Sequence, residues 1–474
     1  MRNQLRRFAE FTHFDKSALA PLVLAAFLRI GLMALAFFRT GTQAMTQGDT
    51  SSYLEPGRNL ILHGGFNTMG LPETDRTPGY PIFAMLTGMI VGNVLLTILA
   101  QILLSLVSLL LVRKIADQIF PDSNCGLIAA WLFAIEPLTL VSTMRIMPET
   151  LFVFLILLMT ERVLAFQQNG RFSGLIIAGT SLAVATYVRP VSYYLVFPLA
   201  AGLAVTAGKH RGLRWKAPLV LLISVLPFLA AWQVRNYIET GYSGFSSIVE
   251  QNLYFFQSAE VTAELKHISL GAEQSQLGYP DESDYIAMHP EQRQWRLSRR
   301  LHFMKTEALR ILSQHPGLYL KTHIAGLAMV AFTPGATELL QLVGAYPSTD
   351  SMPHRILNEG VAISVIRVMT AHPAVMFTMV LLEIFLLLLY GFAISGTLSA
   401  RNSQSRSVLY AVIGISLYFL LISGGAQAVG RYRLPIMPAL CILAAGGLPR
   451  LRQKKSGAIE TPLEHPLLQF ANRS

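Results

Sequence analysis

Long apolar runs recur along the chain, separated by short polar segments. Ten runs come close to the roughly 20 residues that a helix needs to cross a bilayer. The first is longer than the apolar core of a signal peptide, so we expect it to be an uncleaved membrane helix. The predicted spans are roughly 17–38, 93–113, 125–143, 148–166, 173–187, 190–207, 217–236, 373–398, 407–424 and 434–448. The pattern therefore predicts an all-α polytopic membrane protein.

The stretch 316–333 is also apolar enough to span, but one extra crossing would move the C-terminus to the other side of the membrane. Either this stretch is re-entrant or lies on the surface, or residues 355–371 cross back. The sequence thus predicts ten spans and allows twelve.

Composition agrees with this class of protein. The chain has 474 residues, of which 52% are hydrophobic and only 14% are charged. A soluble protein carries about 25% charged residues, so a soluble enzyme and a disordered protein are both excluded. Two cysteines leave little room for disulfides. The net charge of +11 indicates cytoplasmic Lys and Arg in a membrane protein, not nucleic-acid binding.

Basic residues set the expected orientation, because cytoplasmic loops carry the excess of Lys and Arg. Five clusters fall on one side if both termini are cytoplasmic. The clusters are Arg2, Arg6, Arg7 and Lys16; Arg113 and Lys114; Lys209, Arg211, Arg214 and Lys216; Arg401 and Arg406; and Arg450, Arg452, Lys454 and Lys455. The expected units are a membrane module at 1–236 with its first outer loop at 40–92, a large outer loop at 237–315, a second membrane module at 316–450 and a cytoplasmic tail at 451–474.

The large outer loop contains a basic amphipathic segment at 293–310. Six basic residues alternate there with apolar residues at helical spacing, as in helices that lie on an anionic bilayer surface. The other interpretation is a solvated helix packed against the protein. The basic residues are Arg293, Arg296, Arg299, Arg300, Lys305 and Arg310.

Candidate chemistry concentrates in the first outer loop. Asp49 lies about ten residues after the first span, at the expected membrane surface. A single aspartate in a loop is usually only solvated, but Tyr53, His63 and a rigid Pro-Gly-Tyr-Pro corner follow it. Because proline fixes φ and glycine permits positive φ, Arg76 and Tyr80 are expected to sit on a defined bend. Such loops on a rigid scaffold tend to carry function.

A second acidic residue is expected at the same face. Glu149 follows Pro148 in the short outer turn that also contains Arg145. Proline suits the first turn of a helix, where a carboxylate is favoured. Glu149 therefore either stabilises a helix N-terminus or pairs with Asp49 across one outward-facing cavity.

Several arginines lie at expected outer helix ends, against the general charge trend. Arginine is the preferred bidentate ligand of phosphate, so these residues predict a site for an anionic lipid head group or for a phosphate-bearing substrate. Arg235 and Asn236 could join this site or act as an interface anchor. The other members are Arg189, Arg431 and Arg433, with Tyr432 between the last two.

Together these motifs resemble the bacterial GT-C glycosyltransferases, the group that includes the protein O-mannosyltransferases and the aminoarabinose transferase of lipid A. The first-loop pattern carries most of the resemblance, and the later motifs follow in the same order. The large outer loop and the stretch 334–372 resemble nothing that we can name. The motifs are Gly48-Asp49, Tyr53, Leu62-His63-Gly64-Gly65-Phe66, Arg76-Thr77-Pro78-Gly79-Tyr80-Pro81, Pro148-Glu149, Val188-Arg189-Pro190, Arg235-Asn236 and Arg431-Tyr432-Arg433-Leu434-Pro435.

The resemblance implies a GT-C-like bundle of about 10–12 membrane helices with amphipathic helices at its outer face. It also implies an inverting glycosyltransferase in the bacterial inner membrane, with its active site on the periplasmic side. The donor would be a sugar on a polyprenyl phosphate, and the acceptor a hydroxyl of a glycan, lipid or protein. Asp49 would be the general base, supported by Glu149. If a divalent cation such as Mg²⁺ or Mn²⁺ takes part, these two carboxylates are its candidate ligands.

A transporter or flippase of lipid-linked saccharides is the main alternative. Arg29 lies within the first span, and intramembrane charges mark substrate pathways in such proteins. We find no internal repeat of the kind common in transporters, and the conspicuous polar residues collect at one membrane face. A polytopic scaffold that uses the large outer loop as a partner surface is a third possibility.

Overall fold

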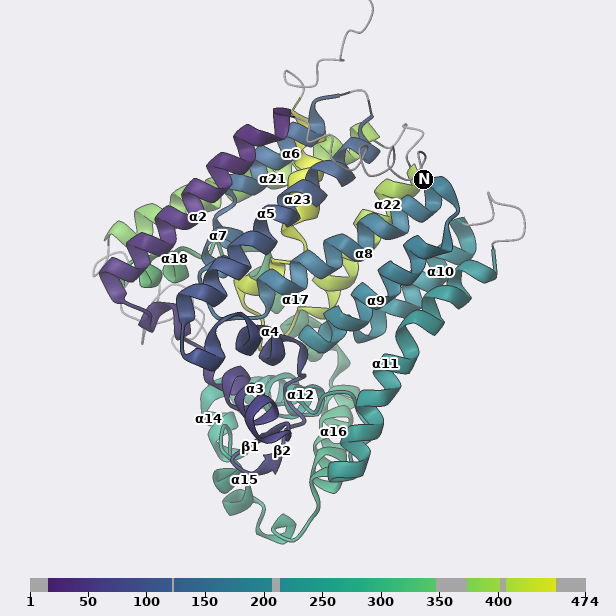
Figure 1. The fold of residues 1–474 in the computed structure, drawn as a ribbon. Helices are drawn as coiled ribbons and strands as arrows, with labels where there is room; N and C mark the ends of the chain where they lie inside the picture. Colours follow the sequence, from purple (N-terminus) through teal and green to yellow (C-terminus); the bar gives the residue numbers. More distant parts are fainter. Residues whose placement is uncertain (1–15, 122, 207–213, 347–372, 401–405, 449–474) are drawn as a thin grey trace, which may run out of the picture.

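The fold was determined as a computed structural model, which describes residues 16–121, 123–206, 214–346, 373–400 and 406–448. This part of the chain is almost entirely helical (Figure 1), which confirms the all-α expectation. Its long helices are α2 (Leu19–Thr40), α5 (Val94–Ile119), α8 (Glu149–Asn169), α9 (Phe172–Val188), α11 (Lys216–Thr240), α21 (Pro373–Ala400) and α22 (Arg406–Ile422).

Shorter elements complete the molecule. α6 (Cys125–Ile135), α7 (Pro137–Thr143), α10 (Val196–Thr206), α18 (Ala336–Leu342) and α23 (Met437–Gly447) pack with the long helices. α3 (Thr50–His63), α4 (Gly79–Thr87) and an antiparallel hairpin of β1 (Asn67–Thr68) and β2 (Leu71–Pro72) form the first loop. The remaining helices are α12 (Ile248–Asn252), α13 (Ala259–Lys266), α14 (Leu270–Gln276), α15 (Glu282–Met288), α16 (Leu297–Gln314) and α17 (Pro316–Phe332).

Every predicted span corresponds to helix, but the spans differ in length. Within the described residues, four helices are long and apolar enough to cross a membrane, namely α2, α5, α11 and α21. A fifth crossing is possible if α6 and α7 count as one broken span. Several other predicted spans form apolar helices of 10–17 residues. The chain is therefore a multi-pass membrane protein in which short helices are packed among long ones.

The predicted span 125–143 is bent by 56° between α6 and α7. The bend occurs at Glu136, because Pro137 cannot continue the helix that precedes it. The Glu136 carboxylate accepts hydrogen bonds from the backbone N–H groups of Leu138 and Thr139, at 3.0 and 2.7 Å, and so caps α7. The predicted span at 125–143 is therefore two helices joined at a bend, which together are apolar and long enough for one broken span.

An ion pair joins two of the long helices. Lys114, in the second half of α5, pairs with Glu161, in the second half of α8, at 2.7 Å. Of the predicted basic clusters, Arg2, Arg6, Arg7, Lys209, Arg211, Arg401 and those after residue 448 lie outside the described residues, as does the tail 451–474.

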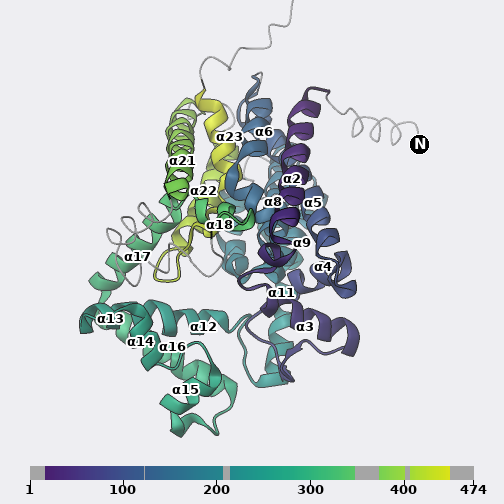
Figure 2. The same ribbon diagram turned by 90° about the vertical axis from the view of Figure 1, so that its left-hand side faces the viewer.

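A second group of helices, the outer cluster (residues 242–314), lies at the lower end of the bundle (Figures 1 and 2). Its own core contains Tyr254, Phe255, Tyr285 and Leu301. The amphipathic segment predicted at 293–310 is α16, and its apolar side, with Leu301, Met304, Ala308 and Leu312, is buried. α16 packs on α12 and on the π-helical stretch 253–258. Of the two interpretations, the structure supports a helix packed against protein.

Helix α17 does not cross the bundle. Lys321 in its first half pairs with Glu264 of the outer cluster at 2.9 Å. Its last turn is bonded to Arg433, which precedes α23 at the same lower end. The described structure therefore favours a surface-lying or re-entrant 316–333, while the alternative partner 355–371 lies outside the described residues.

Candidate active site

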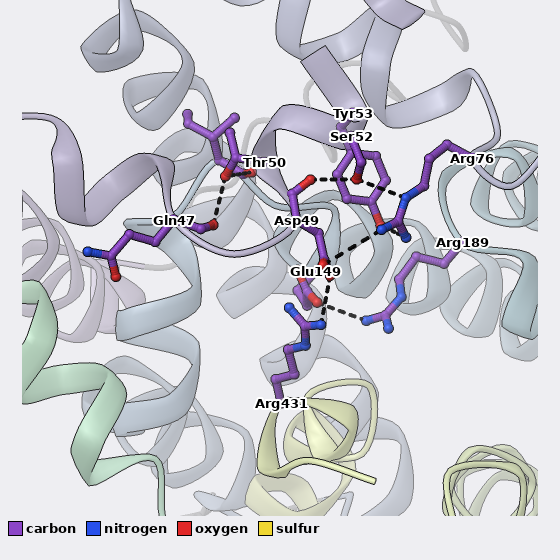
Figure 3. Close-up of polar contacts among 10 residues, drawn as sticks. Gln47, Asp49, Thr50, Ser52, Tyr53, Arg76, Glu149, Arg189 and Arg431 are labelled. Atoms are coloured by element: carbon purple, nitrogen blue, oxygen red, sulfur yellow. Dashed lines mark hydrogen bonds and ion pairs between the residues drawn. The ribbon is translucent and has the colours of Figure 1, made fainter. Parts of the chain in front are cut away.

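Four helix ends meet at the lower end of the bundle and bring distant residues together. Asp49 follows α2, Glu149 begins α8, Arg189 ends α9, and Arg431 precedes α23. A backbone hydrogen bond of 2.8 Å from Ile146 to the carbonyl of Met45 ties the first loop to the turn before α8. Figure 3 shows the resulting cluster of carboxylates and guanidinium groups.

Asp49 occupies the position before α3 but does not cap that helix with its side chain. Its Oδ2 instead accepts a hydrogen bond of 2.8 Å from Nη2 of Arg431, and its Oδ1 lies 3.7 Å from Nη2 of Arg76 (Figure 3). The Asp49 side chain is 38% exposed, so a substrate can still reach it. The structure thus places this carboxylate between two arginines that are far apart in the sequence.

Glu149 is buried more deeply than Asp49, with only 4% of its side chain exposed. Its Oε1 accepts a hydrogen bond of 3.2 Å from Nη1 of Arg189, and within the described structure its Oε2 is buried without a hydrogen-bond partner. Glu149 is the first residue of α8, where the charge of a carboxylate is favoured. The two predicted roles are therefore compatible, because the bond to Arg189 also places Glu149 in the charged cluster around Asp49.

Aromatic rings hold the arginines in place. The guanidinium of Arg76 lies 4.6 Å from the ring centroid of Tyr53 and also donates to the Oγ of Ser52 at 3.0 Å. Tyr432 lies 5.5 Å from the guanidinium of Arg189 and 5.8 Å from that of Arg431. Such cation–π contacts fix the direction of a guanidinium group while leaving its N–H groups free to donate.

Electrostatics keep the Asp49 carboxylate ionised. Burial alone would raise its pKa, but the positive charges of Arg431 and Arg76 outweigh burial and hold the pKa of Asp49 below its usual value. Burial opposes the charge of Arg431 in turn, yet Glu149 and Asp49 hold the pKa of Arg431 above its usual value. Both partners are therefore charged at neutral pH.

The site carries a surplus of positive charge. Asp49 and Glu149 contribute two negative charges, and Arg76, Arg189 and Arg431 contribute three positive ones. Within the described residues, no three His, Cys, Asp or Glu side chains come together in a way that could hold a metal. Asp49 and one oxygen of Glu149 are paired with guanidinium groups, and the arginines of this cluster suit a phosphate.

Two other predicted residues lie around the site and not in its centre. Tyr80 is fully buried, and its hydroxyl donates to Gln101 at 3.0 Å. Gln101 in turn donates to the backbone carbonyl of Arg145 at 2.8 Å, so Tyr80 supports the turn before α8. The Arg145 side chain reaches towards α18, where its Nη2 lies 3.4 Å from the carbonyl of Glu338.

The structure places four further candidates outside the cluster. His63 is exposed at the end of α3. Arg433 is buried and donates to the carbonyls of Val330 and Ala331, both at 2.7 Å, so it caps α17. Arg235 donates to the carbonyls of Phe66 and Glu73, and Asn236 to those of Gly244 and Phe245. These last two residues join α11 to the first loop and to the outer cluster.

Sequence reasoning missed three residues at the site. Gln101 is a polar residue within an apolar span, which was an available signal. The Ser52 hydroxyl donates to the backbone carbonyl of Asp49 at 2.7 Å and accepts a hydrogen bond from Arg76, so it links these two residues. Tyr279 of the outer cluster is close enough to Asp49 to respond to its charge: burial raises the pKa of Tyr279, and Asp49 raises it further. Nothing in the sequence around Tyr279 indicates this proximity.

The family whose sequence model matches the chain is described as dolichyl-phosphate-mannose-protein mannosyltransferase, and the match covers residues 75–233. This match supports the resemblance expected from the sequence, over a segment that contains Arg76, Glu149 and Arg189. Asp49 and Arg431 lie outside the matched range. No curated protein matches the chain.

Among solved structures, the chain is similar to the archaeal oligosaccharyltransferase AglB from Archaeoglobus fulgidus, solved in complex with an inhibitory peptide and a dolichol-phosphate. The two sequences are 14% identical and the TM-score is 0.48. The similarity covers 90% of this chain and 50% of that one, so the chain spans about half the length of that protein.

Proposed function

We propose that this protein is an integral-membrane glycosyltransferase that moves a sugar from a polyprenyl-phosphate donor to a hydroxyl acceptor. The observation that carries the proposal is the carboxylate of Asp49 held between Arg431 and Arg76 at the meeting point of four helix ends. A transferase of this kind needs a base for the attacking hydroxyl and fixed positive charge for the departing phosphate. The match to a family described by its dolichyl-phosphate-mannose substrate supports the same class of donor.

The reaction is a single displacement with inversion at the anomeric carbon. The acceptor oxygen attacks that carbon as the bond from the carbon to the phosphate oxygen breaks, and Asp49 accepts the hydroxyl proton. Negative charge grows on the leaving polyprenyl phosphate, and Arg431 and Arg189 stabilise it. Glu149 keeps Arg189 in position through its 3.2 Å contact. Proton transfer of this kind contributes about 10²–10⁴-fold to a rate.

The pairing of Asp49 with Arg431 describes the site before the donor binds. A phosphate is a stronger ligand for a guanidinium than one carboxylate oxygen, because it offers two parallel hydrogen bonds. Donor binding would therefore draw Arg431 away from Asp49. The loss of that hydrogen bond raises the basicity of Asp49 at the moment when the acceptor needs a base. The Asp49 side chain can respond because it is only partly buried.

The proposed location is the bacterial inner membrane, with the site on the periplasmic face. Supporting this orientation, Lys114 and the N-terminal residues of α11 and α22, Lys216 and Arg406, belong to clusters expected on the cytoplasmic side. Asp49, Glu149, Arg189 and Arg431 lie at the opposite helix ends. The aliphatic tail of a prenyl donor can then remain in the bilayer while its phosphate meets the arginines.

The test uses purified protein in proteoliposomes. The donors are radiolabelled polyprenyl-phosphate sugars, including the mannose derivative, and membranes from cells that lack the protein provide the acceptor. The wild type is expected to form a new glycosidic bond, and Asp49→Asn to lose about 10²-fold or more of that rate. Glu307→Gln, a carboxylate change on the outer surface of α16, is the matched control and keeps the wild-type rate.

Two outcomes would contradict the proposal in different ways. Transfer by Asp49→Asn at the wild-type rate would remove Asp49 from the role of base. Movement of labelled donor across the bilayer by the wild type, without a new glycosidic bond under any acceptor condition, would favour the flippase instead. Arg29, the intramembrane charge that suggested this alternative, is fully buried and bonded to Ser105 and to the carbonyl of Ala134.

A further inference from the structure

A large groove lies beside the candidate active site, between the first loop and the outer cluster. Its volume is about 1140 Å³. The β1–β2 hairpin forms one wall, the last residues of α11 a second, and α15 and α16 a third. This is more than the 300–1,000 Å³ or so of a pocket for one small molecule, so the groove suits an extended ligand.

The groove and the active site adjoin at residues 75–76. Asp75 lines the groove, and Nη2 of the next residue, Arg76, lies 3.7 Å from Oδ1 of Asp49. This junction is firmly held, because the Asp75 carboxylate accepts hydrogen bonds from Ser247 and Gln251 of the outer cluster. A ligand in the groove is therefore adjacent to the proposed base.

The groove is acidic, in contrast to the active site. Five carboxylates and two arginines line it, which leaves three negative charges in excess. Arg300 forms an ion pair with Glu282, which leaves four carboxylates against Arg296 and the same excess of three negative charges. A polyanionic ligand such as a phosphorylated lipid head group would be repelled from this surface. The carboxylates are Glu73, Asp75, Glu239, Asp281 and Glu282, and the arginines are Arg296 and Arg300.

Two walls of the groove, the hairpin and the end of α11, carry exposed apolar side chains. Met69 is 88% exposed, Tyr237 63% and Ile238 74%. Such a surface matches the chemistry of a pyranose ring. The C–H groups of the ring pack on apolar and aromatic side chains, and its hydroxyls donate hydrogen bonds to carboxylates. An extended peptide fits less well. Three of the lining elements are helices, whose backbone groups are bonded internally, and each strand of the hairpin offers an edge of only two residues, which is short for pairing with an extended peptide.

We propose that this groove binds the acceptor as an uncharged oligosaccharide or polysaccharide chain and presents one of its hydroxyls to Asp49. The inference rests on the proposed transferase function and names the acceptor class for it. Tyr237 and Ile238 provide the packing surface, and Glu239 accepts hydrogen bonds from sugar hydroxyls. These side chains are exposed, so they can be changed without disturbing the core.

The test measures two ligands separately on full-length protein in nanodiscs. Saturation-transfer NMR reports the binding of neutral oligosaccharides of six to eight glucose, mannose or galactose residues. Uronic-acid oligosaccharides of the same length and a lysine- and serine-rich peptide provide the comparison. Native mass spectrometry reports the binding of a short-chain polyprenyl phosphate to the same samples.

Neutral oligosaccharides are expected to bind, and Tyr237→Ala to weaken them about 2- to 10-fold, as for loss of one aromatic contact. Glu239→Gln should weaken them as well, while Glu307→Gln on the outer surface of α16 should not. None of these variants should affect polyprenyl-phosphate binding, whereas Arg431→Gln should weaken it strongly and leave oligosaccharide binding intact.

The outcomes separate the two proposals. Stronger binding of uronic-acid chains or of the peptide, unchanged binding in Tyr237→Ala and Glu239→Gln, or no oligosaccharide binding at all would overturn the groove assignment. Retained polyprenyl-phosphate binding in that case would leave the transferase standing. Oligosaccharide binding that depends on Tyr237, together with no binding of any prenyl phosphate, would overturn the transferase and keep the groove as a glycan site.

Discussion

At the scale of single residues, the carboxylate of Asp49 has two properties that usually conflict. Its pairing with Arg431 and Arg76 keeps it ionised, but the same pairing makes it a weak base. The phosphate of the donor would compete with Asp49 for Arg431. Asp49 then becomes a stronger base, but only while the donor is bound. The free protein is then protected from unproductive proton transfer.

The influence of Arg431 on Asp49 predicts a shift in pH dependence. A lowered pKa keeps Asp49 ionised as the pH falls, so the acid limb of kcat/KM for the wild type lies below the usual range of an aspartate. Removing the charge in Arg431→Gln raises the pKa of Asp49 and moves this limb to higher pH. The rate itself falls by about 10²–10³-fold, as for loss of one fixed electrostatic donor.

Transfer rates between pH 3.5 and 8 in proteoliposomes measure this shift. Arg310→Gln, on the exposed side of α16, is the control and keeps the wild-type profile. An acid limb at the same pH in wild type and Arg431→Gln would show that Arg431 does not lower the pKa of Asp49 in the free protein.

The sequence identified most members of the site but not their arrangement. Asp49 and Arg431 were both candidates. They are 382 positions apart in the sequence, so their contact could be inferred only from a resemblance in motif order. Arg431 and Arg433 looked equivalent. The short 3-10 helix Gly430–Arg433 directs one towards Asp49 and the other towards α17, and no local pattern distinguishes them. Tyr279 could not be found because its approach depends on the fold of the outer cluster.

At the scale of elements, the close packing of α4 against α9 fixes the position of Arg189. A Cβ atom added to Gly79, the first residue of α4, would lie 2.7 Å from the backbone of Tyr187. Side-chain atoms do not approach backbone this closely, so only glycine allows the contact. Arg189 comes two residues after Tyr187 and ends α9. The bend at 78–81 therefore positions the site through its backbone packing against α9.

This packing predicts that Gly79→Ala damages the site without touching a reacting group. The new methyl group displaces the end of α9 and with it Arg189, at a cost of about 1–3 kcal/mol in stability. We expect a lower melting temperature and weaker binding of the polyprenyl-phosphate donor, measured by thermal unfolding and by the KM of transfer. Gly202→Ala, in α10 with no atom within 4 Å of the added Cβ, is the control and should match the wild type. Wild-type behaviour of Gly79→Ala would mean that α9 can shift freely.

Helix positions were predictable from apolar periodicity, whereas helix breaks and packing partners were not. The first predicted span, 17–38, corresponds to α2 at Leu19–Thr40. The bend at Glu136 follows from Pro137, which the hydropathy pattern alone does not register. For α16, the sequence indicated an apolar face but could not say whether lipid or protein covers it. Only the partner helix α12 and the adjacent π-helical stretch settle this question.

At the scale of the whole molecule, charge is divided between two adjoining compartments. The active site is positive and faces the place where a lipid-linked phosphate would arrive, while the groove is negative and opens beside the outer cluster. A phosphate-bearing ligand is thereby attracted to the active site and repelled from the groove, which remains open to an uncharged ligand. Residues 75–76 connect the two compartments and fix their separation.

The hydrogen bonds of Arg235 have a mechanical consequence for the membrane in which the protein works. Helix α11 has 25 residues and so is about 37 Å long, against about 30 Å for the hydrocarbon layer. Such a helix adjusts its tilt to lipid chain length, and Arg235 would transmit the tilt to the first loop through its 2.6 Å bonds to Phe66 and Glu73. The kcat in vesicles of 14-, 18- and 22-carbon lipids should therefore vary. Arg235→Gln should flatten that dependence, and equal kcat values for the wild type in all three would show that α11 and the loop move independently.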